Sequence, residues 1–358
     1  MKKIIIITGG TGGHVLPALS IYDHLKDSFD VILITDSRGS KFINEKNYPF
    51  NLIEVPNLFS RLYLLPINLI KFLFSIFRSY FFLKKQNISY LISTGGYMSL
   101  PFCIASKFLK IKIFLFEPNS VLGRANKYML KLSKKIICYD SNVKNLPQKY
   151  QNKIYITNPI LRKEIYLQKK NQNKYPSDIK KIVVIGGSQG AKFFDRNITN
   201  LILKISETFK IEVSQQVFDK NEQLVIEQKY NNAFIKNKLF SFDEKLYQNL
   251  GNFDFAITRS GASAISELAF FNIPFLAIPF PFARDQHQFF NAKFYESKDC
   301  CWLIKQENFN IDLVNDLIVN LLKEKNDYLK KKENLEKISN QNTWNIVNKK
   351  LFDLINEN

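Results

Sequence analysis

The sequence predicts an α/β protein with two domains, each built on a doubly wound parallel sheet. Short apolar runs alternate with helical patterns along the chain, as in right-handed βαβ units. One layout, an apolar strand followed by a glycine turn and a helix, occurs near residue 3 and again near residue 181. The length of 358 residues suits two domains better than a single core.

In the first half of the chain, near-continuous apolar runs predict buried parallel strands. They are KIIIIT at 3–8, VILIT at 31–35, YLIST at 90–94, KIFLF at 112–116 and KIICY at 135–139. Helical patterns lie between these runs, and helices are expected around 14–26, 99–109 and 121–132.

A polar stretch at 167–181 interrupts this series, and a second series of strands follows it. Its members are KIVVI at 181–185, FDFAIT at 253–258 and PFLAIPF at 274–280. We therefore expect a first domain over 1–158, completed by a carboxyl-terminal helix at about 341–358, and a second domain over 159–340.

The composition is that of a globular chain, with 46% apolar and 23% charged residues. Lysine and arginine outnumber aspartate and glutamate by 51 to 32, a formal net charge of +19. This balance favours an anionic partner, which the charge alone leaves open between nucleic acid, anionic lipid and a phosphorylated substrate. Most of the lysines are interpreted as ordinary surface residues, and no nucleic acid partner is expected.

Two features indicate a reducing, cytoplasmic compartment. The four cysteines, which lack any C-x-x-C spacing, are expected to be buried thiols. The start MKKIIIITGG resembles a signal peptide, but its apolar run is short and ends in glycine, so we expect a strand.

Three glycine turns follow predicted strands: TGGTGG at 8–13, STGG at 93–96 and IGGSQG at 185–190. At the carboxyl end of a parallel strand, such a turn lets backbone N–H groups approach an anion, and the following helix start adds partial positive charge. Neither G-x-x-x-x-G-K-[ST] nor G-x-G-x-x-G is present, so a P-loop ATPase and a dinucleotide site are not expected. One such turn is as often a tight turn without a ligand, but three in two matching halves favour phosphate binding.

Six segments, in this order, resemble the peptidoglycan glycosyltransferases of family 28. They are TGGTGGHVLPAL, STGGYMSLP, FEPNSVLGRANK, TNPILR, IGGSQGAK and RSGASAISELAFFNIPFLAIPFPFARDQHQFFNA. The resemblance implies the GT-B architecture, two Rossmann-like domains facing across a cleft. It also implies transfer of GlcNAc from UDP-GlcNAc to undecaprenyl-diphospho-MurNAc-pentapeptide (lipid I), giving lipid II. The first domain would bind the acceptor and the membrane, and the second would bind UDP-GlcNAc.

The resemblance places donor-binding residues mainly in the second half. Arg162 and Ser188 would hold the diphosphate, Glu267 the ribose hydroxyls and Gln288 the GlcNAc hydroxyls. The uracil would meet the backbone near Phe242, and the nucleotide would lie along Ala262, Ser263, Ala264, Ile265 and Ser266. No D-x-D motif occurs, so helix starts and a cationic side chain are expected to stabilise the leaving diphosphate, with no metal and no cofactor.

His14 directly follows the first glycine turn and is expected to be the general base, because imidazole can accept the proton of an attacking hydroxyl. The alternative is a histidine at a helix start that only binds phosphate. His24, further along the same helix, is expected at the surface. The resemblance adds four substrate-binding residues in this domain: Thr11, Gly12, Gly13 and Asn119.

Three positions depart from the family pattern. His287 stands where the family usually has a second glutamine before Gln288, and Phe116 and Pro118 replace residues of a usual His-Glu-Gln-Asn run. One sugar contact and the surroundings of Asn119 are therefore expected to differ.

The segment at 62–85, LYLLPINLIKFLFSIFRSYFFLKK, is long and apolar, but Pro66, Asn68, Lys71 and Arg78 argue against a membrane span. We interpret 64–83 as an interfacial helix that rests on an anionic membrane surface. Phe74, Phe81 and Phe82 would face the lipid, and the protein would be peripheral at the cytoplasmic face of the inner membrane.

Other functions on this scaffold stay open. A related lipid glycosyltransferase with a diacylglycerol acceptor and a nucleotide-sugar epimerase would share the strand and glycine pattern. A nicotinamide oxidoreductase is disfavoured by the missing G-x-G-x-x-G. The sequence does not indicate an oligomeric state.

Overall fold

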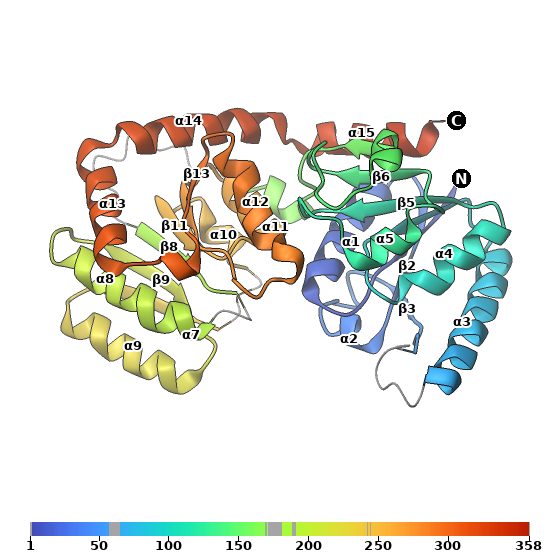
Figure 1. Ribbon diagram of the computed structural model, residues 1–358, viewed down its shortest axis with the longest axis horizontal. Helices are drawn as coiled ribbons and strands as arrows, with labels where there is room; N and C mark the ends of the chain where they lie inside the picture. Colours follow the sequence, from blue (N-terminus) through green and yellow to red (C-terminus); the bar gives the residue numbers. More distant parts are fainter. Residues whose placement is uncertain are drawn as a thin grey trace. The chain divides into compact units, whose positions relative to one another are not determined.

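The computed structural model describes residues 2–56, 65–168, 170, 181–187, 191–241, 243 and 245–357. It divides into two compact units. Unit 1 comprises Met1–Lys163 and Trp344–Asn358, and unit 2 comprises Glu164–Thr343. Each unit has one parallel sheet with helices on its faces (Figure 1), as the predicted α/β class requires.

Unit 1 contains a seven-stranded sheet in the order β3-β2-β1-β4-β5-β6-β7. Its strands are β1 (Lys3–Ile7), β2 (Asp30–Thr35), β3 (Phe50–Leu52), β4 (Tyr90–Ser93), β5 (Lys112–Glu117), β6 (Lys135–Cys138) and β7 (Ile154–Ile156). Its helices are α1 (Gly12–Leu25), α2 (Ser37–Ser40), α3 (Leu65–Gln86), α4 (Ser99–Phe108), α5 (Arg124–Met129), the 3₁₀ turn Gln148–Lys153 and α15 (Trp344–Asn356).

Unit 2 contains a six-stranded sheet in the order β10-β9-β8-β11-β12-β13. Its strands are β8 (Lys181–Ile185), β9 (Glu212–Gln216), β10 (Lys236–Phe240), β11 (Phe255–Thr258), β12 (Phe275–Ala277) and β13 (Cys301–Leu303). Helix α6 (Lys163–Tyr166) crosses the boundary, and α7 (Ala191–Phe193) continues through a π-turn, Phe194–Ile198. The other helices are α8 (Thr199–Ser206), α9 (Lys220–Asn232), α10 (Tyr247–Leu250), α11 (Ala262–Phe270), α12 (His287–Glu296), α13 (Ile311–Glu324) and α14 (Asn326–Gln341).

Both sheets reverse their winding beside the first strand of the unit. β1 lies between β2 and β4, and β8 lies between β9 and β11. In open parallel sheets, ligands bind outside the carboxyl ends of the strands at this switch point. The predicted glycine turns follow β1, β4 and β8, so all three lie at a switch point.

The boundary between the units differs slightly from the expected one at 158. The Ile160 N–H donates to the Tyr139 hydroxyl at 3.1 Å, and Lys350 Nζ donates to the Asn158 side chain at 2.9 Å. These bonds keep the segment up to Lys163 on unit 1.

Two sequence expectations in unit 1 need correction. The helix expected over 121–132 is only α5, because Val121 forms a β-bridge with Lys144 and Leu122 N–H bonds the Lys144 carbonyl. His24 is buried, not at the surface. Its ring stacks on Trp344 of α15 at 3.8 Å and bonds Asn348. Burial lowers the pKa of His24 to about 4, although the hydrogen bond to Asn348 acts in the opposite direction.

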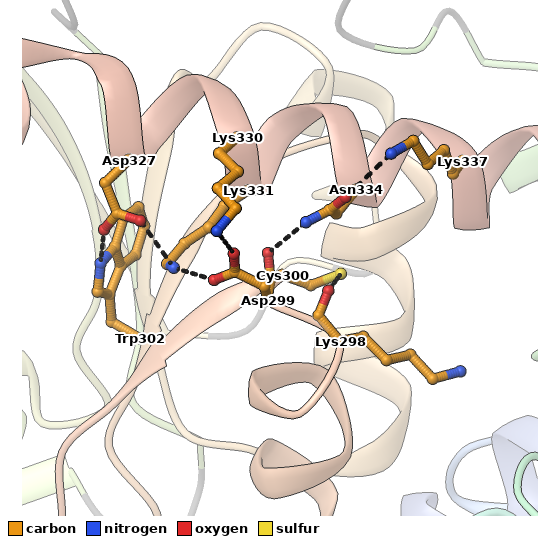
Figure 2. A network of polar contacts seen from close by, with 9 residues as sticks. All are labelled: Lys298, Asp299, Cys300, Trp302, Asp327, Lys330, Lys331, Asn334 and Lys337. Atoms are coloured by element: carbon orange, nitrogen blue, oxygen red, sulfur yellow. Dashed lines mark hydrogen bonds and ion pairs between the residues drawn. The ribbon is translucent and has the colours of Figure 1, made fainter.

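In unit 2, a polar network fixes α14 to the turn before β13 (Figure 2). The buried Lys331 ammonium bonds Asp299 at 2.5 Å and Asp327 at 3.0 Å, and the Trp302 indole donates to Asp327 at 2.7 Å. Asp299 is held at φ 53°, and Lys330 adds a second ion pair to it at 2.8 Å. The four cysteines are buried and free, as expected.

Candidate functional site

The first glycine turn brings His14 beside the turn that follows β4. Gly10 has φ +85°, and α1 begins two residues later. The Nδ1 atom of half-buried His14 lies 2.8 Å from the carbonyl oxygen of Thr94. Because a carbonyl oxygen only accepts, Nδ1 carries a proton, and in the neutral form of the ring Nε2 is the acceptor. Proton acceptance at Nε2 is the chemistry that a general base needs.

The turn after β4 accommodates this ring only because it consists of glycines. Gly95 and Gly96 have φ values of +91° and +83°. A Cβ atom at Gly95 would lie 3.1 Å from Cε1 of His14, and one at Gly96 would lie 3.3 Å from the Gly9 carbonyl oxygen. A side chain at either position would displace the histidine or strain the backbone.

Asn119 is oriented by a buried carboxylate at the end of β5. Its side-chain amide donates to Oε1 of Glu117 at 3.0 Å. The other carboxylate oxygen accepts from the Gly123 N–H at 2.7 Å and from Nδ2 of Asn126 at 3.0 Å. Asn126 also comes within 3.9 Å of the Cβ position of Gly95, so this network reaches the turn that holds His14. Sequence analysis singled out Asn119 but neither Glu117 nor Asn126, although both lie in the same FEPNSVLGRANK segment.

A second carboxylate occupies part of the first glycine turn. Oδ1 of Asp36, which follows β2, accepts from the Gly10 N–H at 2.9 Å and from the Gly39 N–H at 2.8 Å. Arg38 bonds the other oxygen at 2.7 Å. Burial alone would raise the pKa of Asp36, but these bonds hold it below its ordinary value. The Gly10 N–H is therefore taken by the protein's own anion. Only the helix start from Thr11 to Gly13, with N–H groups that have no acceptor inside the helix, still suits phosphate.

The corresponding turn of unit 2 is described as far as Gly187. Ser188 and Phe242, both expected on the donor, lie outside the described residues. Gly187 has φ +65°, and its N–H donates to Oε1 of Gln216, the last residue of β9, at 3.0 Å. The Gln216 amide in turn donates to the Ser241 carbonyl at 3.0 Å.

Helix α11 presents its first turn differently from its second. Ala262, Ser263 and Ala264 are half-buried, and their N–H groups lie at the open helix start. The Ile265 side chain is buried, and its N–H already bonds the Gly261 carbonyl at 3.2 Å. The Ser266 hydroxyl is buried 3.3 Å from the Tyr295 hydroxyl of α12.

Of the predicted nucleotide-binding run, the first three residues thus have the best-placed backbone donors, and Glu267 is half-buried one turn further along.

Gln288 lies on α12, which packs beside α11. Its Oε1 accepts from the Phe280 N–H at 3.0 Å, and this leaves the two amide protons for another partner. Asp285 and Gln286, just before the helix, both have φ 53°, a strained conformation of the kind that concentrates at functional sites. Nδ1 of His287 bonds the Arg284 carbonyl at 2.9 Å.

Arg162 is half-buried and belongs to the first segment of unit 1, whereas sequence analysis grouped it with the donor residues of the second half. Unit 1 thus gathers His14, the glycine turns after β1 and β4, and Asn119. Unit 2 gathers Ala262–Glu267 and Gln288. In the described ranges, no three His, Cys, Asp or Glu side chains cluster as metal ligands would.

Two family models match the chain. The glycosyltransferase family 28 N-terminal domain matches residues 4–138, and the family 28 C-terminal domain matches residues 181–344.

Two curated relatives share one name, UDP-N-acetylglucosamine--N-acetylmuramyl-(pentapeptide) pyrophosphoryl-undecaprenol N-acetylglucosamine transferase. The one from Pelagibacter ubique (strain HTCC1062) is 42% identical over 357 residues, covering 100% of this chain and 99% of the relative. The one from Rickettsia bellii (strain RML369-C) is 33% identical over 331 residues, covering 90% of this chain and 91% of the relative.

Solved structures share the fold. The crystal structure of Acinetobacter baumannii MurG superposes with a TM-score of 0.78 at 21% identity, covering 99% of both chains. The UDP-GlcNAc 2-epimerase from Neisseria meningitidis, bound to UDP-GlcNAc, has a TM-score of 0.68 at 12% identity and covers 99% of this chain and 100% of the epimerase. These likenesses show the two-domain fold of GT-B enzymes.

Proposed function

The chain belongs to glycosyltransferase family 28, and from this premise we propose that it transfers GlcNAc from UDP-GlcNAc to lipid I. The acceptor group is the C4 hydroxyl of MurNAc in undecaprenyl-diphospho-MurNAc-pentapeptide, and the product is lipid II. The observation that carries this proposal is 42% identity over the whole chain to a relative named for this transfer. Lipid II is a precursor of peptidoglycan, so cell shape and division would depend on the enzyme.

His14 is the proposed general base. Its Nδ1–H bond to Thr94 sets the tautomer, so that Nε2 can take the proton of the C4 hydroxyl. The freed oxygen attacks the anomeric carbon from the face opposite the phosphate, the bond from that carbon to the phosphate oxygen breaks, and UDP leaves with the electron pair. This displacement inverts the α-linked donor to a β-1,4 product.

Unit 2 is proposed to hold the donor. The start of α11 offers three backbone N–H groups and the positive end of its dipole to the nucleotide diphosphate. Glu267, one turn on, would accept the two ribose hydroxyls, and the Gln288 amide would donate to the GlcNAc hydroxyls. Arg162 from unit 1 and Ser188 remain proposed diphosphate ligands by resemblance.

Helix α3 is proposed to rest on the membrane surface. Of the described helices, it alone is long and apolar enough, by length and composition, to cross a bilayer. Its exposed apolar side chains are Leu65, Ile67, Leu69, Ile70, Leu73, Phe74, Phe77 and Phe81. On the opposite side of the helix, Phe72 and Leu83 are buried. Helix α3 packs beside α4 (Figure 1), and this contact favours an interfacial helix over a span.

One residue of the expected lipid-facing set is assigned wrongly. Phe82 is half-buried and packs edge-on against Phe102 at 6.5 Å, so it belongs to the core of unit 1. Phe74 and Phe77 are better probes, at 61% and 59% exposure. The double change Phe74→Ser/Phe77→Ser should reduce sedimentation with phosphatidylglycerol vesicles, because burial of aromatic side chains in the interface is lost.

The matched control is Phe234→Ser on unit 2, a phenylalanine that is 95% exposed. It should leave vesicle binding unchanged. If both variants sediment like the natural protein, α3 is not the membrane surface.

The transfer itself is tested by incubating the protein with labelled UDP-GlcNAc and lipid I and extracting the lipid. Label in lipid II supports the proposal. Transfer to diacylglycerol, or epimerisation of the sugar without an acceptor, would assign the chain to one of the alternative activities.

A further inference from the structure

Arg259 is a buried cation directly after β11, and its side chain is only 4% exposed. Nη1 donates to the carbonyl oxygens of Ile278 and Pro279 at 2.9 and 3.0 Å, and Nη2 donates to Oε1 of Gln306 at 2.6 Å. The donor on Nε is buried and has no hydrogen-bond partner among the described residues. All the acceptors that these bonds use are neutral.

The remaining neighbours of the guanidinium are aromatic. Its central carbon lies 4.7, 5.4 and 5.5 Å from the ring centres of Phe194, Phe193 and Phe280. In the described part of the chain, no carboxylate lies within ion-pair distance of Arg259. Burial lowers the pKa of Arg259 to about 10, so it stays charged at neutral pH. A buried charge without a counter-charge is costly, which argues that the positive charge itself has a use.

The location of this charge indicates that use. A Cβ atom at Gly187, in the turn after β8, would lie 3.9 Å from both Cβ and Cγ of Arg259. Three residues beyond Arg259, Ala262 begins α11. The stem of Arg259 therefore lies against the glycine turn at the switch point of the unit 2 sheet. Its guanidinium lies between the rings of α7 and the π-turn that follow this glycine turn and the segment after β12.

We propose that Arg259 is a positioning residue for the donor's diphosphate. It does not touch the phosphates; it supplies a fixed positive charge behind the β8 turn and the start of α11. Through its bonds to Ile278, Pro279 and Gln306, it also ties the segments after β12 and β13 to that place. This inference rests on the proposed function, because it takes the ligand of unit 2 to be a nucleoside diphosphate.

A charge effect and a merely structural effect make different predictions for a series of ligands. Uridine is neutral, whereas UMP and UDP carry increasing negative charge. Loss of a buried positive charge should weaken binding in proportion to the ligand's charge. Misplaced loops should weaken all three ligands alike.

The experiment compares the dissociation constants of uridine, UMP and UDP for Arg259→Met, Arg259→Gln and Arg259→Lys by titration calorimetry. The two neutral variants should lose roughly tenfold in affinity for each negative charge of the ligand, the size expected for unit charges about 10 Å apart at an effective dielectric near 20. UDP should therefore lose more than UMP, and uridine less than about twofold. Arg259→Lys should retain most of the preference for UDP, because it keeps the charge.

Gln306→Leu is the matched control. It removes one acceptor of the guanidinium but keeps the charge, so it should lower the melting temperature without changing the ratio of UDP to uridine affinity. Equal loss for uridine and UDP in the neutral variants would overturn the proposal. If neither neutral variant folds, the test is made with Arg259→Lys alone. A lower ratio of UDP to uridine affinity in that variant than in the natural protein contradicts the inference. If the natural protein itself fails to bind uridine nucleotides, the proposed function fails instead.

Discussion

The two units share one topology around their first strand, but the glycine turn at its end meets different chemistry. In unit 1, the Gly10 N–H bonds the Asp36 carboxylate. In unit 2, the Gly187 N–H donates to the neutral Gln216 amide, and the stem of the Arg259 side chain lies against the turn. Asp36 and Gln216 both stand at the end of the neighbouring strand, β2 or β9.

This difference shows that the fold determines where the N–H groups lie, while the residue at the end of the neighbouring strand sets the local charge. The Asp36 carboxylate occupies the Gly10 N–H and disfavours a phosphate at that group, so only the helix start from Thr11 to Gly13 stays open to one. A neutral amide with a buried cation suits a diphosphate. This difference supports the proposal that unit 1 carries the base and unit 2 binds the donor.

The largest expected effect is that of removing the base from unit 1. His14→Ala should lower turnover by about 10²–10⁴-fold, the usual contribution of general-base catalysis, and leave UDP-GlcNAc affinity nearly unchanged. Steady-state rates and calorimetry measure the two quantities separately. His287→Ala, which removes the histidine at the start of α12, should not reproduce this loss.

A variant at His14 with near-normal turnover and weakened lipid I binding would contradict the assignment. His14 would then be a phosphate ligand, and the proposal that unit 1 carries the general base would be wrong.

The next effect separates the units by their pH-dependent stability. Folding lowers the pKa of His24 in unit 1 from 6.5 to about 4, so the unfolded state binds the proton more readily. Below pH 6.5 the stability of unit 1 should therefore fall, by about 3 kcal/mol when pH 4 is reached. His24→Phe, which keeps an aromatic ring against Trp344, should abolish this dependence.

Unit 2 should respond in the opposite sense. Burial, with smaller contributions from Glu222 and Asp219, raises the pKa of Asp195 to about 6. The folded state then binds the proton more readily, so unit 2 should gain stability as the pH falls from 6 towards 4. As the pH is lowered, scanning calorimetry should show the unfolding transition of unit 1 moving to lower temperature and that of unit 2 moving to higher temperature. Asp195→Asn should remove the shift of the unit 2 transition. Transitions that shift together would contradict this separation.

A smaller effect follows from giving unit 2 the carboxylate of unit 1. Gln216→Glu would place a negative charge on the Gly187 N–H and should weaken UDP binding by about tenfold, by charge repulsion. Uridine affinity is the internal control, since it reports any distortion of the loop by the lost bond to Ser241. An unchanged ratio of UDP to uridine affinity would show that this turn does not face the phosphates.

The sequence predicted the sheet class, the three glycine turns and the strands β1, β2, β4, β5, β6, β8, β11 and β12, because these depend on local patterns. It did not predict β3, β7, β9, β10 and β13, which are short or carry polar residues. Short, isoleucine-rich runs such as KIIIIT favour buried strands, and glycine favours a positive φ, as at Gly95. Asn119 and His14 were found because they stand inside recognisable motifs.

Residues that act through distant contacts could not be found in this way. Asp36 reaches the first turn from the end of the neighbouring strand, 26 residues along the chain. The burial of His24 depends on α15, more than 300 residues later. Phe82 and Phe74 are equally apolar, and only the packing of α3 on α4 separates core from surface.

The central claim is that unit 2, and not the first glycine turn of unit 1, holds the donor's diphosphate. Amide chemical-shift mapping during a titration with UDP tests it most directly. The account predicts the largest shifts at Gly187 and at Ala262–Ala264, with Gly10 and His14 unmoved. Large shifts confined to residues 9–14, with no change in the amide shifts of α11, would contradict the claim that unit 2 holds the diphosphate.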